Sequence, residues 1–124
     1  MQLVHDRPQG YFFIRSCSPV AVTVIDRELT TSFIIMPDRV VERWPVDSAS
    51  TIDAAAIAAL LELAPELVLL GSGARQVFPP REALRPLLRA GIGVEVMDNA
   101  AACRTYNLLA AESRRVAAAL ILAS

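Results

Sequence analysis

The sequence contains no lysine, one histidine and two cysteines, and these absences exclude several kinds of site. A phosphate-binding loop requires a lysine after its glycines. A zinc site needs several histidine or cysteine ligands, and one histidine with two scattered cysteines cannot supply them. His5 has no acid or base partner near it in the sequence, so we interpret it as a surface or edge residue. We therefore expect neither a metal nor a cofactor.

Long hydrophobic runs and an excess of positive charge are also absent. The longest apolar runs, such as residues 116–123, are far shorter than the roughly 20 residues of a membrane-spanning helix. No secretory signal is apparent at the N-terminus. The formal net charge is -1, which argues against nucleic-acid binding. All 12 cationic side chains are arginine, which indicates composition bias or, if they cluster in space, recognition of a planar anion. We expect a soluble, cytoplasmic protein.

The two cysteines, Cys17 and Cys103, are far apart in the sequence. One disulfide could join them, but without a secretory signal we expect reduced thiols. Cys103 lies in an alanine-rich segment with helical character, which predicts a buried, inert thiol. A redox sensor is the alternative.

The remaining composition, 54% apolar in 124 residues, predicts one domain, 1–124, with a real core. Four β-branched or aromatic runs in the first half predict an antiparallel meander, with residues 26–28 as a turn. Trp44 is expected to anchor the core. The predicted strands are residues 11–16, 20–25, 31–36 and 40–45.

The second half alternates between helical and strand patterns. It predicts helices at about 52–64, 80–90 and 99–112, with buried strands at 67–70 and 92–97. Strand, helix and strand in this order form a right-handed crossover with parallel pairing. Ser50 or Thr51 is expected to cap the first helix, and Asp98 or Asn99 the third. The pattern of residues 114–122 fits either a helix or a strand.

The strand at 67–70 ends at Gly71-Ser72-Gly73, beside the position expected for Asp98 and Asn99. Sites in open α/β sheets tend to lie outside such strand ends. Glycine amides and a helix N-terminus favour an anion, so the residues predict a ligand pocket or, alternatively, a purely structural turn. The candidate ligand-binding residues are Gly71, Ser72, Gly73, Arg75, Asp98 and Asn99. A nucleophilic serine would need a base that the sequence does not offer, so we expect no catalytic residue.

A second polar group surrounds the third helix. We expect Arg104, Glu112 and Arg114 to form a buried ion pair or network that joins the last helix to the last segment. We expect Tyr106 and Asn107 to bind backbone groups rather than a substrate. These five residues are therefore candidates for a structural network.

Three segments together resemble one small family of unknown biochemical activity. They are residues 69–73, residues 91–98, and residues 101–108 followed by Glu112, Arg114 and Val116, and Trp44 also matches. The family includes the mitochondrial NADH dehydrogenase complex I assembly factor three and the adipogenesis-associated domain-containing protein, together with stand-alone bacterial and archaeal members. Ser72 and Asn99 stand where threonine is usual in the family, and Ser113 where glycine is common.

The resemblance implies a three-layer α/β fold with a mixed central sheet and an additional antiparallel β layer from the N-terminal half. It also implies that residues 114–122 form a strand. With no catalytic set in sight, it favours a non-catalytic protein-interaction or assembly-type module whose partner is another protein or a second copy. An exposed apolar patch at residues 11–14 or 33–36 would mark such a module. The alternative is a small-anion or small-molecule site at Gly71-Ser72-Gly73, with an enzyme not excluded.

Overall fold

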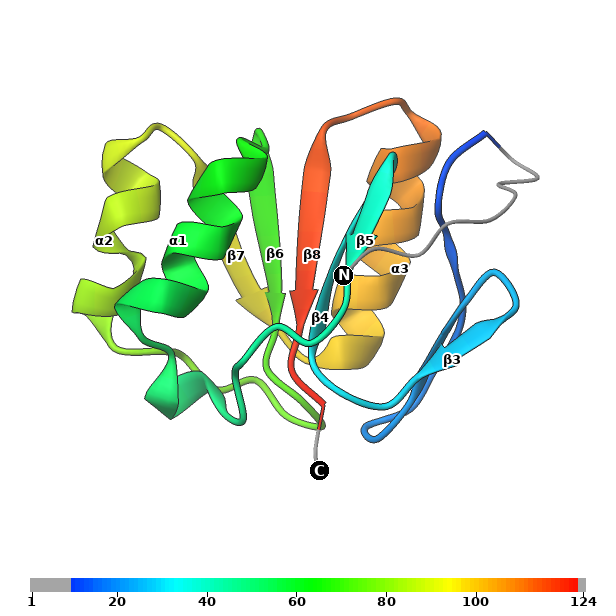
Figure 1. Cartoon of the computed structure of the whole chain (residues 1–124), viewed down its shortest axis with the longest axis horizontal. Helices are drawn as coiled ribbons and strands as arrows, with labels where there is room; N and C mark the ends of the chain where they lie inside the picture. The colour runs from blue at the N-terminus through cyan, green and yellow to red at the C-terminus, as the bar shows by residue number, and fades with distance from the viewer. Residues whose placement is uncertain (1–9, 123–124) are drawn as a thin grey trace.

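The computed structural model describes residues 10–122, so the expectation for His5 lies outside the described residues (Figure 1). This part of the chain contains a five-stranded sheet in the order β5-β4-β8-β6-β7 and a three-stranded sheet in the order β1-β2-β3. The strands are β1 (Ile14–Cys17), β2 (Val22–Val24), β3 (Arg27–Leu29), β4 (Phe33–Met36), β5 (Arg39–Val41), β6 (Leu67–Gly71), β7 (Gly93–Met97) and β8 (Val116–Leu120). The helices are α1 (Ala54–Leu63), α2 (Arg81–Arg89) and α3 (Asn99–Ala111), with a 3-10 turn, η1, at Ala49–Thr51.

The five-stranded sheet is mixed. Strand β6 is parallel to both β7 and β8, whereas β4 is antiparallel to β8 and to β5. All five residues of β8 are buried. Its three alanines would favour a helix by intrinsic propensity, but a strand at this position pairs with β4 on one side and β6 on the other. The strand implied by the family resemblance is therefore confirmed.

The sheet separates two apolar clusters. Helices α1 and α2 cover one face, and α3 and the small sheet cover the other (Figure 1). Side chains of β6 alternate between the clusters: Val68 and Leu70 face α1 and α2, and Leu69 faces α3. Trp44 is 2% exposed and its Nε1 donates to the carbonyl of Ala56 at 3.0 Å, as expected of a core anchor. The three-layer α/β fold is confirmed.

The predicted meander is wrong in its second half. Strands β1, β2 and β3 do form an antiparallel sheet, but Arg27 and Glu28, part of the turn predicted at residues 26–28, belong to its third strand. The turn lies at Ile25 and Asp26, where Ile25 has a positive φ of 57°. The next strand, β4, leaves this sheet and pairs with β8. Its four residues are all fully buried, and only a position inside the central sheet covers both of their faces.

The helix starts correct the cap expected for the first helix and confirm one of the two caps expected for the third. Asp53 is the cap of α1, because its Oδ1 accepts from the amide of Ala56 at 2.9 Å, whereas Ser50 and Thr51 lie in η1. Asp98 caps α3 through the amide of Ala101 at 2.8 Å. Asn99 is therefore free for another role.

Candidate functional site

The parallel pairing of β6 and β7 brings the predicted site residues to one edge of the sheet. Gly71 lies opposite Met97, so the turn that follows β6 meets the start of α3. Five of the six candidate ligand-binding residues lie at this edge: Gly71, Ser72, Gly73 and Asn99 through contacts with one another or with Met97, and Asp98 as the residue before α3. The sixth, Arg75, is exposed.

The hydroxyl of Ser72 closes the loop that follows it. Its Oγ lies 2.7 Å from the carbonyl oxygen of Arg75 and 3.2 Å from that of Met97, and it accepts from the amide of Val77 at 2.9 Å. The amide of Ser72 donates to Met97 O at 2.9 Å. This hydroxyl is used in structural bonds, and all three of these partners are backbone groups, none of them a base that could activate it as a nucleophile.

Asn99 joins the turn to the end of β8. Its side chain accepts from the amide of Gly73 at 3.0 Å and donates to the carbonyl of Ile121 at 2.8 Å, while its own amide donates to Gly73 O at 2.8 Å. The residue is 2% exposed. A Cβ at Gly71 would overlap both the Asn99 side chain and Leu120, so this close approach requires glycine. The Gly73 amide that might have bound an anion is already paired within the chain.

A cavity of about 170 Å³ adjoins this edge. Gly73, Asp98 and Asn99 line it, together with residues 17–19 at the end of β1 and in the loop that follows. Ser72 and Arg75 do not line it. Asp98, an acidic residue, is part of this lining, and negative charge there disfavours an anion.

The predicted network around α3 is only partly formed. The hydroxyl of Tyr106 donates to Phe12 O at 2.7 Å, and burial raises the pKa of this phenol. Asn107 accepts from the amide of Ile14 at 2.9 Å and donates to its carbonyl at 2.7 Å. These bonds fix α3 against β1, so both side chains bind backbone groups.

The expected buried ion pairs of Arg104, Glu112 and Arg114 are absent from the described residues. All three side chains are exposed, and Arg114 instead lies 4.0 Å from Glu66. Exposed pairs contribute little to stability, so these charges do not fix the last helix. The prediction failed because helix position alone does not tell whether a charge faces the core.

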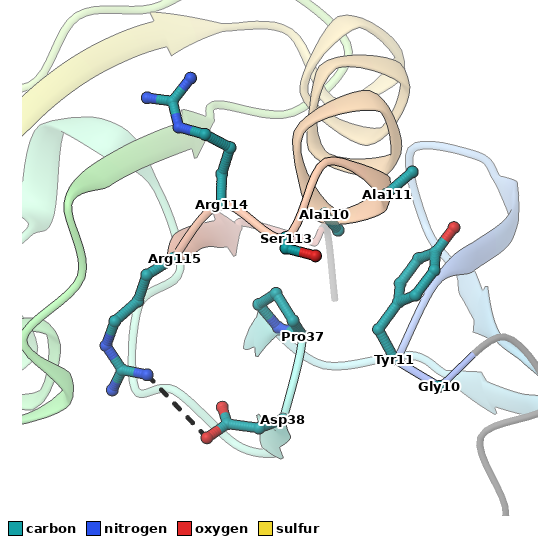
Figure 2. Close-up of a pocket in the computed structure, with 9 residues that line it drawn as sticks. All are labelled: Gly10, Tyr11, Pro37, Asp38, Ala110, Ala111, Ser113, Arg114 and Arg115. Carbon is teal, nitrogen blue, oxygen red and sulfur yellow. Dashed lines mark ion pairs between the residues drawn. The ribbon is translucent and has the colours of Figure 1, made fainter.

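Another cavity, of about 410 Å³, lies between Tyr11, Asp38 and the start of β8 (Figure 2). Two of its charged groups, Arg115 and Asp38, approach each other, whereas Arg114 points away from both (Figure 2). Arg115 donates to the carbonyls of Ala64 and Leu63, at 3.1 and 2.7 Å, and lies 3.9 Å from Asp38. Arg115 thus binds the C-terminal end of α1, a structural role that the sequence analysis missed.

The exposed apolar side chains are not where the sequence analysis placed them. Residues 33–36 are fully buried, and Phe12 and Ile14 are buried too. Phe78 is 66% exposed and Val77 42%, on the loop between the glycine turn and α2. The remaining large exposed apolar residues within 10–122 are Val20, Leu88 and Leu108. A phenylalanine before two prolines, outside any periodic pattern, is the signal that could have revealed this loop.

Two features are absent from residues 10–122. No helix there has the length and apolar character needed to cross a membrane. No three histidine, cysteine, aspartate or glutamate side chains in this part of the chain gather closely enough to hold a metal ion.

Comparison with known proteins places the chain in a family. Residues 14–121 match the family described as protein of unknown function (DUF498/DUF598), and the chain belongs to it. It is 36% identical to the NADH dehydrogenase [ubiquinone] 1 alpha subcomplex assembly factor 3 of Danio rerio over 110 residues, covering 87% of this chain and 63% of that one. It is 36% identical to a 13 kDa major membrane protein of Francisella tularensis over 76 residues, covering 61% of this chain and 62% of that one. The chain thus spans about three fifths of the length of these curated relatives.

A solved structure shows the same fold. The NMR structure of a Xanthomonas campestris protein has a TM-score of 0.83 and 45% sequence identity, covering 97% of this chain and 91% of that one. The family resemblance predicted from residues 69–73, 91–98 and 101–108 is confirmed.

Proposed function

We propose that this member of the DUF498/DUF598 family is a non-catalytic protein-interaction or assembly-type module that binds its partner through the loop at residues 77–79. The observation that carries the proposal is the 66% exposure of Phe78 on a loop whose base is closed by internal hydrogen bonds. A large aromatic side chain in water costs free energy unless a partner covers it. Burying it would contribute about 1.5–3 kcal/mol.

The loop is suited to present Phe78 in a fixed position. Ser72 bonds to the carbonyl of Arg75 and the amide of Val77 on either side of Gln76, and the Gln76 side chain donates to Val96 O at 2.9 Å. Pro79 is buried and Pro80 precedes α2. A loop that is ordered before binding loses less conformational entropy on association, and aromatic anchors dominate many interfaces.

The relatives support a protein partner in general terms. One relative that matches most of this chain is named as an assembly factor. The partner of that relative is not assigned to this protein, because the chain spans only 63% of the relative's length. The chemistry of Phe78 and Val77 calls for a folded protein, or a second copy, with an apolar groove. We propose that the protein is cytoplasmic. Because the Francisella relative is named as a membrane protein, fractionation of the protein's own cells is the test of this location.

The experiment compares two equally exposed apolar positions. Phe78→Asp removes the proposed anchor, and Leu108→Asp, at 68% exposure on α3, is the matched control. Tagged wild type and both variants are purified from the native cells, and retained proteins are quantified by mass spectrometry. Self-association is measured in parallel by analytical ultracentrifugation.

We expect one reproducible partner, or a dimer, that Leu108→Asp keeps and Phe78→Asp loses by at least about tenfold, the equivalent of about 1.4 kcal/mol. Retention of the same partner by Phe78→Asp would refute the role of this loop. Both variants must give the wild-type circular dichroism spectrum for the comparison to hold.

The alternative function is binding of a small anion or small molecule by Gly71, Ser72, Gly73, Arg75, Asp98 and Asn99. It is favoured only by the neighbouring cavity of about 170 Å³. An Ala100→Trp variant, which fills part of this cavity and keeps the bonds of Ser72, separates the two functions. A small molecule that native mass spectrometry finds on the wild type and not on this variant, in the absence of any protein partner, would replace the interaction proposal.

A further inference from the structure

A junction between β1 and α3 brings Cys17 and Cys103 to the same cavity, of about 280 Å³. Cys103 is buried, whereas Cys17 is partly exposed and packs against the cluster that contains Cys103. Both thiols are free. Two cysteines that are distant in the sequence thus line the same cavity in the fold.

The junction is fixed by hydrogen bonds close to both cysteines. Asn107 bonds to the amide and the carbonyl of Ile14, and Cys103 lies one turn before Asn107 on the same face of α3. Cys17 is at the other end of β1 from Ile14. Burial raises the pKa of the Cys103 thiol, and the neighbouring Cys17 raises it further. Both side chains line the same cavity and belong to the same apolar cluster, which brings the two thiols near each other.

Among residues 10–122, the charges that line this cavity are of one sign. Arg15 from β1 and Arg104 from α3 line it, and no aspartate or glutamate of this part of the chain does. Both arginines are exposed, and Arg104 opposes the rise in the pKa of Cys103 without overcoming it. A thiol compound that carries carboxylates would be attracted to this opening.

We propose that Cys17 and Cys103 form a modification site, in which Cys17 exchanges with a carboxylate-bearing low-molecular-weight disulfide and Cys103 then closes an intrachain disulfide between β1 and α3. In the first step the Cys17 thiolate attacks one sulfur of the disulfide. A bond forms between them, the reagent's sulfur–sulfur bond breaks, and one thiolate leaves and takes a proton from water. In the second step the Cys103 thiolate attacks the Cys17 sulfur and releases the second thiol. Two protein thiols are oxidised and one disulfide is reduced to two thiols.

The order of attack follows from burial. Cys17 meets the reagent first because it is the more exposed of the two thiols. Burial raises the pKa of the Cys103 thiol, so little of it is the attacking thiolate and the second step is slowed. The mixed disulfide on Cys17 is therefore an observable intermediate.

The test uses the reduced full-length protein with oxidised glutathione as the probe, followed by intact mass and peptide mapping over time. The wild type is expected to pass through a Cys17–glutathione adduct and to end as the Cys17–Cys103 disulfide. Cys103→Ala is expected to stop at the adduct, and Cys17→Ala to leave Cys103 unmodified. The Arg15→Gln, Arg104→Gln double variant is expected to slow the first step by about tenfold at low ionic strength, with no change towards the uncharged 2-hydroxyethyl disulfide.

Several outcomes would overturn the proposal. A wild type that accumulates the adduct without closing the intrachain bond shows that the thiols cannot meet. Modification of Cys103 in Cys17→Ala at the wild-type rate shows that the order is wrong. If the arginine double variant reacts more slowly with oxidised glutathione and with 2-hydroxyethyl disulfide to the same extent, the proposed preference for a carboxylate-bearing disulfide is wrong. If Cys103→Ala fails to fold, the wild-type time course with peptide mapping still decides whether the adduct precedes the intrachain bond.

Discussion

Asn99 offers the most direct test of the carboxyl edge of the sheet, because one buried side chain holds the glycine turn and the end of β8 together. Asn99→Ala removes its bonds to Gly73 N and Ile121 O, which measure 3.0 and 2.8 Å. A buried polar group left without a partner costs about 1–3 kcal/mol. Gly73 is partly exposed and its amide can bind water, whereas the bond to Ile121 is buried. We therefore expect a loss of about 2–4 kcal/mol in the free energy of unfolding.

Asn99→Asp sharpens this test. An aspartate oxygen can still accept from the amide of Gly73, but its other oxygen would face the carbonyl of Ile121, where a donor is needed. The new charge is also buried without a cation. We expect Asn99→Asp to destabilise the protein more than Asn99→Ala does, although its side chain has nearly the same shape.

The assay is urea unfolding followed by the fluorescence of Trp44, which is 2% exposed and reports loss of the core. Leu108→Ala on the same helix is the control, expected within about 0.5 kcal/mol of wild type because Leu108 is exposed. A loss below about 1 kcal/mol for Asn99→Ala would refute the assignment of a structural role to this residue. A smaller loss for Asn99→Asp than for Asn99→Ala would refute the hydrogen-bond directions.

Two further predictions concern the turn and the domain. Gly71→Ala is expected to destabilise the protein by more than about 2 kcal/mol, because its Cβ would overlap Asn99 and Leu120. Gly73 has open space around it but a φ of 108°, so Gly73→Ala is expected to destabilise the protein by only about 1–2 kcal/mol. Equal effects in the same urea assay would contradict the close approach at Gly71. We also expect the chain to unfold as one domain, because the central sheet contributes to both apolar clusters. Trp44 fluorescence and far-ultraviolet circular dichroism should then give coincident transitions, and separated midpoints would argue for two units.

Some helices and strands are predictable from residues within their own segments. Helices α1, α2 and α3 and strands β6 and β7 were predicted from apolar periodicity and from residues such as Pro65, Gly91 and Asp98, which act through their own backbone geometry or side-chain caps. The meeting of the glycine turn with the start of α3 was predictable too, because parallel strands place their carboxyl ends at one edge.

Other features depend on contacts between segments that are distant in the sequence, so only the folded chain shows them. Residues 116–120 carry alanines that suit a helix, and only pairing with β4 and β6 makes them a strand. Strand β4 pairs with β8 instead of continuing the meander, because only the central sheet buries the side chains on both of its faces. The internal bonds of Ser72, the exposure of Phe78 and the approach of Cys17 to Cys103 follow from packing between segments. Side-chain chemistry defines what each residue can bind, but the neighbours that long-range packing supplies determine which of those bonds are made within the chain and which are left for a partner.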